Sequence, residues 1–378
     1  MNRKSFLAMS TAILFSVGVA QAQDPVRIGI VVELSGAGAP AGTNWRDGIK
    51  IAVDEINADG GILGRLVETA EYDTQTDPQT SRALVQKAID EGAYAIWGTI
   101  YSGSTLVNML VAQQNEIPQF VGSESPAIVD KGNPFVFRTS SGAQKGVPAL
   151  TPYFKDTLGA KKVGIAWVNN EFGKGGHDVF AAEMAKVGIE VVADVSSEQA
   201  QTDYAADVAR LKDSGAEAVF VYMNQEESAR FLIEARKQGL AMPLVGEVTL
   251  TEAKVIELAG GAAEGAIAHV GLTATATQIE GIAEFAAKFE QSFNRRPTHD
   301  AIKGYVGAWA TKYVTEMVGE FNGAAFAEKM KNLCLSVAEH PRMLLDTCWD
   351  ATGEMSRPSF MVQVKDGSPV VIGTVPAN

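Results

Sequence analysis

The order of apolar and polar positions in the first 140 residues alternates between the periods of strands and helices. Val26 to Val32 is an apolar, β-branched run, which is typical of a buried strand. Between Trp45 and Ile56 apolar residues recur four, seven, eight and eleven positions after the first, which is the spacing of one helix face. Strands that alternate with helices predict a parallel sheet built from βαβ units. This first series is expected to contain strands at 26–32, 66–72, 94–97 and 118–121 and helices at 45–56, 78–89 and 102–114.

The same alternation begins again after a segment rich in Ser, Gly and Lys, Ser140 to Gly146, which predicts a linker or hinge. Two long helices near 279–294 and 299–318 follow the second series, and the tail from Phe360 alternates like an antiparallel strand. The pattern predicts two consecutive doubly wound α/β units. It leaves open whether the last helices return to the first unit. The second series is expected to contain strands at 162–168, 189–195, 217–223, 243–246 and 266–270 and helices at 174–187, 203–213, 226–238 and 252–259.

Residues 1–22 have the three parts of a cleaved export signal. Arg3 and Lys4 are basic, Phe6 to Ala20 is apolar but too short to span a bilayer, and residues 20–22 form a small-x-small cleavage site. We therefore expect a mature chain that starts near Gln23 and lies in the periplasm, without direct membrane insertion. The length of 378 residues suits two domains.

The formal net charge is −13, and loss of the leader makes the chain still more acidic. Such a charge excludes an electrostatic footprint for nucleic acid and disfavours adhesion to anionic lipid.

Catalytic and cofactor motifs are missing from the sequence. The glycine-rich loop at 35–42 places Ala41 where a dinucleotide fingerprint needs its third glycine, and no Walker lysine follows. No nucleophile-elbow pattern surrounds Ser102 or Ser104. The two cysteines and four scattered histidines match no zinc spacing. We therefore expect no enzyme activity, no cofactor and no metal.

Cys334 and Cys348 are the two cysteines of the chain. Export permits a disulfide between them, and the chain-entropy model values a loop of this length at ~3 kcal/mol. A structural disulfide is preferred here to a redox or metal role.

Two loops follow predicted strands at the edge of the sheet where ligands of open α/β folds bind. The loop at 99–105 contains Tyr101 and Ser102, with Ser102 or Ser104 as the expected N-cap of the next helix. The loop at 122–126 contains Gly122, Ser123 and Glu124. Backbone N–H groups and Ser hydroxyls at such turns suit a carboxylate, although plain helix capping accounts equally well for either loop alone.

The chain resembles the periplasmic leucine/isoleucine/valine-binding proteins of ABC importers, which are type I periplasmic binding proteins. The resemblance covers nearly the whole mature chain, and the element DEINADGGILGR is its most specific part. It implies two Rossmann-like lobes joined by a three-stranded hinge, with residues 24–141 and 272–346 in one lobe and 142–271 and 347–378 in the other. The similar stretches lie at 33–65, 71–78, 133–141, 304–314 and 349–367.

The resemblance also implies a ligand site in the cleft between the lobes. Ser102 matches the carboxylate-binding serine of the family, and Phe172 matches an aromatic lid residue of the second lobe. Gly122, Ser123 and Glu124 match the positions of the next loop.

Three departures from the family pattern bear on the ligand. Glu124 stands where the family has a small hydroxyl, and Asn224 replaces an aromatic residue. The acid that holds an amino-acid ammonium is either displaced to Glu247 or lost. Tyr101 and Phe172 could instead enclose an aromatic acid, or Glu124 could receive a cationic group of the ligand.

The function expected from these features is that of a solute-binding protein, a monomer that carries a small carboxylate-bearing solute to the membrane permease of an ABC importer. The ligand is an amino acid, of the branched-chain type that the family binds, or an aromatic acid. A ligand-binding subunit of a sensory system is one alternative, and an exported enzyme is another.

Overall fold

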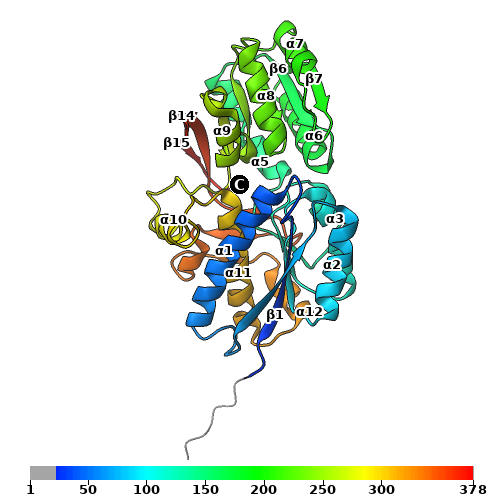
Figure 1. Cartoon of the computed structure of the whole chain (residues 1–378), viewed down its shortest axis with the longest axis vertical. Coiled ribbons are helices and arrows are strands. Elements are labelled where there is room, and N and C mark those ends of the chain that lie inside the picture. The colour runs from blue at the N-terminus through cyan, green and yellow to red at the C-terminus, as the bar shows by residue number, and fades with distance from the viewer. Residues whose placement is uncertain (1–22, 378) are drawn as a thin grey trace, which may run out of the picture.

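The computed structural model describes residues 23–377, so the expected export signal at 1–22 lies outside the described residues. Two α/β lobes are stacked along the long axis of the molecule (Figure 1). Among the described residues, none of the helices has the length and hydropathy needed to cross a bilayer.

The first lobe is built on a five-stranded parallel sheet of order β2-β1-β3-β4-β5. Apolar residues of one face of β1 pack against α1 and α11, and those of the other face pack against α2 and α3. The elements of this lobe in its first segment are β1 (Val26–Val32), α1 (Ala39–Ala58), β2 (Val67–Asp73), α2 (Pro78–Asp90), β3 (Ala95–Trp97), α3 (Ser102–Gln114), β4 (Gln119–Val121), α4 (Ala127–Asp130) and β5 (Val136–Arg138).

The second lobe has a seven-stranded sheet of order β15-β14-β10-β9-β8-β6-β7, in which β14 runs antiparallel to both of its neighbours, β10 and β15, and the other pairs are parallel. Helices α5 and α6 cover one face, and α7, α8 and α9 cover the other. Its elements are α5 (Ala143–Ala149), β6 (Lys162–Val168), α6 (Glu171–Lys186), β7 (Glu190–Ser197), α7 (Ala205–Asp213), β8 (Ala218–Tyr222), α8 (Gln225–Lys237), β9 (Leu244–Glu247), α9 (Ala253–Ala259), β10 (Ile267–Val270), β14 (Ser359–Lys365) and β15 (Ser368–Val375).

The chain returns to the first lobe after β10, which answers the question that periodicity left open. Helices α10 (Glu280–Phe293), α11 (His299–Val318) and α12 (Gly323–Met330) contribute to the core of the first lobe. A small antiparallel sheet of β11 (Cys334–Leu335), β12 (Thr347–Trp349) and β13 (Met355–Ser356) follows them.

This small sheet lies against the first lobe, whereas the sequence assigned everything from 347 onward to the second. Trp349 is buried beside Phe120, and its Nε1 donates to the carbonyl of Arg138 at 2.7 Å. Only the segment from β14 onward therefore pairs with the second sheet. Cys334 and Cys348 face each other on β11 and β12 and form a disulfide.

Three segments cross between the lobes, after β5, after β10 and after β13. At the third crossing the buried Arg357 donates to the carbonyl of Thr139 at the first crossing, at 2.8 Å. The expected architecture of two doubly wound lobes joined by a three-stranded hinge is confirmed. The sequence missed β5, α12 and β11 to β13 and the short helices α4 and α5, whose short runs lack a readable period. Helix α5 begins within the segment predicted as a linker or hinge, and the tail predicted as one strand forms two, β14 and β15.

Helices α1 and α11 cross at very short distance and lie side by side in the first lobe (Figure 1). A Cβ on Gly48 would lie 1.8 Å from the carbonyl oxygen of Ala301, and one on Gly304 would lie 2.4 Å from that of Trp45. Two glycines thus allow backbone contact, and that contact fixes the first turn of α11 at the cleft.

Glu33, directly after β1, ties the loop that follows β3 to the first strand. Its buried carboxylate accepts hydrogen bonds from the backbone N–H groups of Ile100 and Tyr101, both at 3.2 Å. Burial raises the pKa of Glu33 to about 7 in spite of these bonds.

The variant Gly48→Ala is expected to lower the free energy of unfolding by on the order of 2 kcal/mol, because the new methyl group meets backbone that cannot rotate away. Urea unfolding followed by circular dichroism measures the change. Gly103→Ala is the matched control, since a Cβ there meets nothing closer than Pro78 Cγ at 3.9 Å. Equal stability of the two variants would contradict the close crossing.

The Glu33 carboxyl is expected to make stability fall as the pH rises from 4.5 to about 7, because in that range the folded state holds a proton that the unfolded chain has released. The contribution is complete below 4.5 and lost above 7. The free energy of unfolding is measured as a function of pH for the parent and for Glu33→Gln, and the difference between the two curves gives the contribution of the Glu33 carboxyl. Glu217→Gln is the control with the opposite sign, since the exposed Glu217 accepts from the backbone N–H groups of Lys161 and Lys162 and its pKa is lowered by them.

Candidate functional site

A cavity of about 40 Å³ lies between the lobes, at the carboxyl ends of the strands of both sheets. This is the edge at which open α/β sheets bind ligands. The first lobe contributes residues after β1, β3 and β4 and the first turn of α11, and the second contributes residues after β6, β8 and β9. The lining residues are Ala41, Ile100, Tyr101, Ser102, Gly122, Glu124, Phe172, Asn224, Gln225, Val248, Thr249, His299, Asp300 and Lys303.

Ser102 begins α3 and lines the cavity, where its Oγ accepts a hydrogen bond from the N–H of Ser125 at 3.2 Å. Tyr101 is the N-cap of this helix, and neither Ser102 nor Ser104 caps it as the sequence predicted. The first N–H groups of α3 have no partner within the helix and face its N-terminal side. Gly122 is needed beside them because a Cβ there would lie 2.8 Å from the Trp45 ring.

Buried Arg138, at the end of β5, holds the loop that carries Glu124 in place. Its guanidinium donates to the carbonyls of Ser123 and Ser125 and forms an ion pair with Glu354 at 2.8 Å. Arg138 is 0% exposed, so these contacts supply its charge with partners away from water. The loop is thereby fixed from behind and presents Glu124 toward the second lobe.

Glu124 joins the lobes across the cleft. One carboxylate oxygen forms an ion pair with Lys303 of α11 at 3.1 Å, and the other accepts from the hydroxyl of Tyr222 in the second lobe at 3.5 Å. The ring of Phe172 stacks on Tyr222 with 4.2 Å between ring centres. The hydrogen bond between Glu124 and Tyr222 thus connects the lobes beside the cavity, and a small solute inside the cavity touches both.

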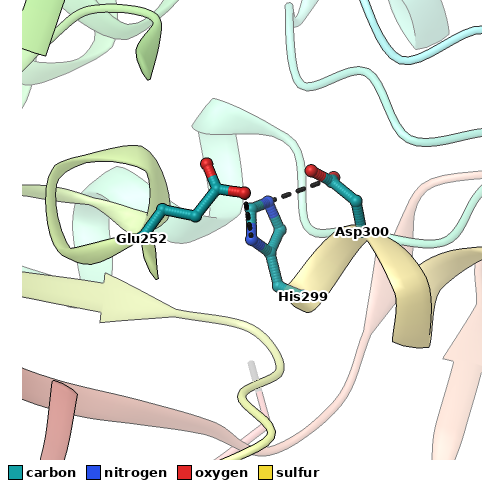
Figure 2. A group of neighbouring side chains, drawn as sticks. All are labelled: Glu252, His299 and Asp300. Atoms are coloured by element: carbon teal, nitrogen blue, oxygen red, sulfur yellow. Dashed lines mark ion pairs between the residues drawn. The ribbon is translucent and has the colours of Figure 1, made fainter. Parts of the chain in front are cut away.

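The first turn of α11 adds a group of charged side chains that faces Glu252, just before α9 (Figure 2). His299 Nε2 lies 3.1 Å from Asp300 Oδ1, and His299 Nδ1 lies 3.7 Å from Glu252 Oε1. Burial raises the pKa of Glu252 to about 7. Burial also acts to raise the pKa of Asp300, but His299 and Lys303 outweigh it and hold that pKa below its usual range.

The structure brings six of the eight predicted site residues to the cavity wall: Tyr101, Ser102, Gly122, Glu124, Phe172 and Asn224.

Ser123 and Glu247 do not line the cavity. The Ser123 hydroxyl turns back to the Thr99 carbonyl, which it meets at 3.2 Å. Both carboxylate oxygens of Glu247 face His269 Nδ1 at 3.2 Å, and Glu247 lines a smaller adjoining cavity instead. The ion pair with His269 turns the Glu247 side chain away from the cavity.

Sequence reasoning missed the contribution of α11, namely His299, Asp300 and Lys303. A signal was present, because the helix predicted at 299–318 is otherwise apolar around most of its circumference. Such a helix is buried, and charged residues in its first turn must be buried with it. All three are less than 8% exposed. Buried charges of this kind are candidates for a functional site.

Residues 25–369 match the family described as periplasmic binding protein. The leucine-specific-binding protein of Salmonella typhimurium is 25% identical over 266 residues, which are 70% of this chain and 72% of that protein. An amino acid binding protein of Pseudomonas aeruginosa is 28% identical over 262 residues, which are 68% and 70% of the two chains.

Solved structures share the fold over nearly the full length. A leucine binding protein from Thermotoga maritima superimposes with a TM-score of 0.84 at 21% identity, covering 93% of this chain and 99% of that one. A solute binding protein of an ABC transporter from Rhodopseudomonas palustris, in complex with 3,4-dihydroxy benzoic acid, gives 0.84 at 21% identity, with 94% and 98% covered. Both have the two-lobed architecture, and the match over 25–369 decides membership: the chain belongs to the periplasmic binding protein family, whose members bind small molecules and are not catalysts.

Proposed function

We propose that this protein binds a small carboxylate-bearing solute between its lobes and presents the closed, loaded form to the membrane permease of an ABC importer. The observation that carries the proposal is the cavity whose wall is shared by the two lobes, with Ser102 on one side and Phe172 and Asn224 on the other. A ligand there contacts both lobes only when they are together. Binding therefore favours the closed form by its difference in affinity for the two forms.

A carboxylate is the expected anchor because Ser102 and the first turn of α3 meet at the cavity. The Ser102 hydroxyl already accepts from Ser125 N–H, so its own proton is available to a ligand oxygen. The N-terminal N–H groups and dipole of a 13-residue helix add a favourable field for an anion.

The importer, the periplasmic location and a monomeric state belong to the proposal. Relatives are named for leucine or amino acid binding, and one solved neighbour is the solute binding protein of an ABC transporter. The expected export signal at 1–22 agrees with a role outside the inner membrane. Recognition of the closed form would let the permease ignore the empty protein.

Ligand size is limited by the cavity. Its volume of about 40 Å³ corresponds to room for about three water molecules. A solute of a few non-hydrogen atoms suits this arrangement, and a longer amino acid or an aromatic acid requires the lobes to separate further or Phe172 and Asn224 to move. Amino acids and aromatic acids are the two ligand classes to compare.

A thermal-shift screen of the mature protein, unfolded and refolded to remove bound ligand, is expected to give at least one stabilising compound among aliphatic amino acids, aromatic carboxylates, amides and urea. A ligand at 100 times its Kd adds ~2.7 kcal/mol to the free energy of unfolding, which raises the midpoint measurably. Conversion of the stabilising compound, followed by mass spectrometry, would instead favour an exported enzyme.

Ser102→Ala and Phe172→Ala are each expected to weaken binding of the compound found by about tenfold, because one loses a hydrogen bond and the other an apolar cover. Isothermal titration calorimetry measures the loss. Ser104→Ala is the matched control, since Ser104 is buried two residues along the same helix and does not line the cavity. Unchanged affinity in both site variants would remove the proposed location of the site.

A further inference from the structure

Buried charges alternate in sign along one wall of the cavity. Glu124 pairs with Lys303 at 3.1 Å, and Lys303 Nζ lies 3.5 Å from Asp300 Oδ1. Asp300 in turn faces His299, whose other ring nitrogen faces Glu252 (Figure 2). Three carboxyl groups thus face one ammonium and one imidazole, so the wall keeps an excess of negative charge unless the imidazole and Glu252, whose pKa is raised to about 7, are both protonated.

Several buried hydrogen-bond acceptors on this wall have no donor within the described residues. Asp300 is 1% exposed, its ion pairs with His299 and Lys303 are closest at Oδ1, and its Oδ2 is buried without a hydrogen-bond partner. Oε2 of Glu252 and the hydroxyl of Tyr101 are also buried without a hydrogen-bond partner. Leaving a buried charged acceptor without a donor costs several kcal/mol in general, so an arrangement of this kind is completed by a donor that arrives with the ligand.

The charges around Tyr101 also favour a positively charged ligand group. After burial, the charges that act on its hydroxyl to raise its pKa are all carboxylates, from Glu33, Glu227, Glu252 and Asp300. The potential at this end of the cavity is therefore negative. A positively charged group is favoured there and a second anion is not.

Glu252, His299 and Asp300 also contain the atom types that bind a divalent metal ion. Two features disfavour a metal. One donor atom from each residue lies within 4.8 Å of the others, but the ring nitrogens of His299 face different carboxylates, and Lys303 lies 3.5 Å from the Asp300 oxygen that would be a ligand. An organic cation with several N–H donors fits the open oxygens without displacing either group.

We propose that the solute carries a protonated nitrogen, as an ammonium, amidinium or guanidinium group, and that Asp300, assisted by Glu252 and Tyr101, is its anchor. This rests on the proposed function, because it concerns the same cavity. With the carboxylate at Ser102 and the start of α3, the ligand is a zwitterion. Asp300 then discriminates against acids of the benzoate type that have no basic nitrogen. Glu247 is not the anchor, since both its oxygens face His269.

Matched probes that differ only in the basic nitrogen test the proposal by calorimetry on the refolded mature protein. The pairs are glycine and acetate, β-alanine and propionate, leucine and isocaproate, and aminomethylbenzoate and toluate. In every pair that binds, the nitrogen-bearing member is expected to bind at least about tenfold more tightly, as a charge-assisted hydrogen bond implies. Equal or tighter binding of the acid without nitrogen would overturn the proposal.

In Asp300→Asn the nitrogen-bearing member of a pair is expected to bind at most about threefold more tightly than the other member. In Glu247→Gln the ratio of the two affinities is expected to stay as in the parent. Glu247→Gln is the matched control because it removes another buried carboxylate of the cleft that is ion-paired to a histidine. Since the readout is a ratio within one variant, a general loss of stability does not imitate the effect. Should Asp300→Asn not fold, Glu252→Gln serves in its place, with a partial loss of preference expected.

The remaining outcomes separate this proposal from the one on which it rests. Binding of the acids alone, with the preference unchanged in Asp300→Asn, keeps the solute-binding function and overturns the cation anchor. Stabilisation by Zn²⁺, Mn²⁺ or Mg²⁺ alone that disappears in Asp300→Asn would assign the same side chains to a metal and overturn the proposal. No stabilisation by any probe of any class would overturn both.

Discussion

The close contact of α1 and α11 is the constraint on which the cleft depends. Gly48 and Gly304 let two backbones touch, and that contact brings a helix from the last third of the chain against the first helix. The first turn of α11 is thereby held at the carboxyl edge of the first sheet, where His299, Asp300 and Lys303 become part of the cavity wall. A larger residue at either glycine would move the charged turn away from the loops it faces.

The loops of the cleft are held from behind by buried polar groups. Glu33 fixes the backbone at Ile100 and Tyr101, and Arg138 fixes the carbonyls of Ser123 and Ser125. Neither Glu33 nor Arg138 lines the cavity. Both place a polar head group where water is excluded, so each depends on hydrogen-bond partners within the protein. This arrangement fixes the backbone of the ligand-facing loops.

The two lobes meet at a hydrogen bond between a carboxylate and a phenol. Glu124 of the first lobe accepts from the Tyr222 hydroxyl of the second, whereas the ion pair of Glu124 with Lys303 lies within the first lobe and the stacking of Phe172 on Tyr222 lies within the second. A charged acceptor buried between the lobes costs desolvation, so this hydrogen bond contributes less to closure than its strength in isolation suggests. A ligand that donates a hydrogen bond to Asp300 binds the closed form more tightly than the open form, and this difference in affinity favours closure.

The sequence by itself determined the two-unit α/β architecture, the order of the longer strands and helices and most loops of the cleft, because these follow from local periodicity and from the rule that ligands bind at carboxyl edges. That rule placed Ser102, Gly122 and Glu124 at the site, and the family resemblance added Phe172 and Asn224; all five line the cavity. Tertiary structure alone decided the direction of side chains and the partners of buried charges. Glu247 turns to His269, the segment 347–356 stays with the first lobe, and α11 supplies the charged wall. These depend on contacts between residues 22 to more than 200 positions apart, which no local pattern encodes.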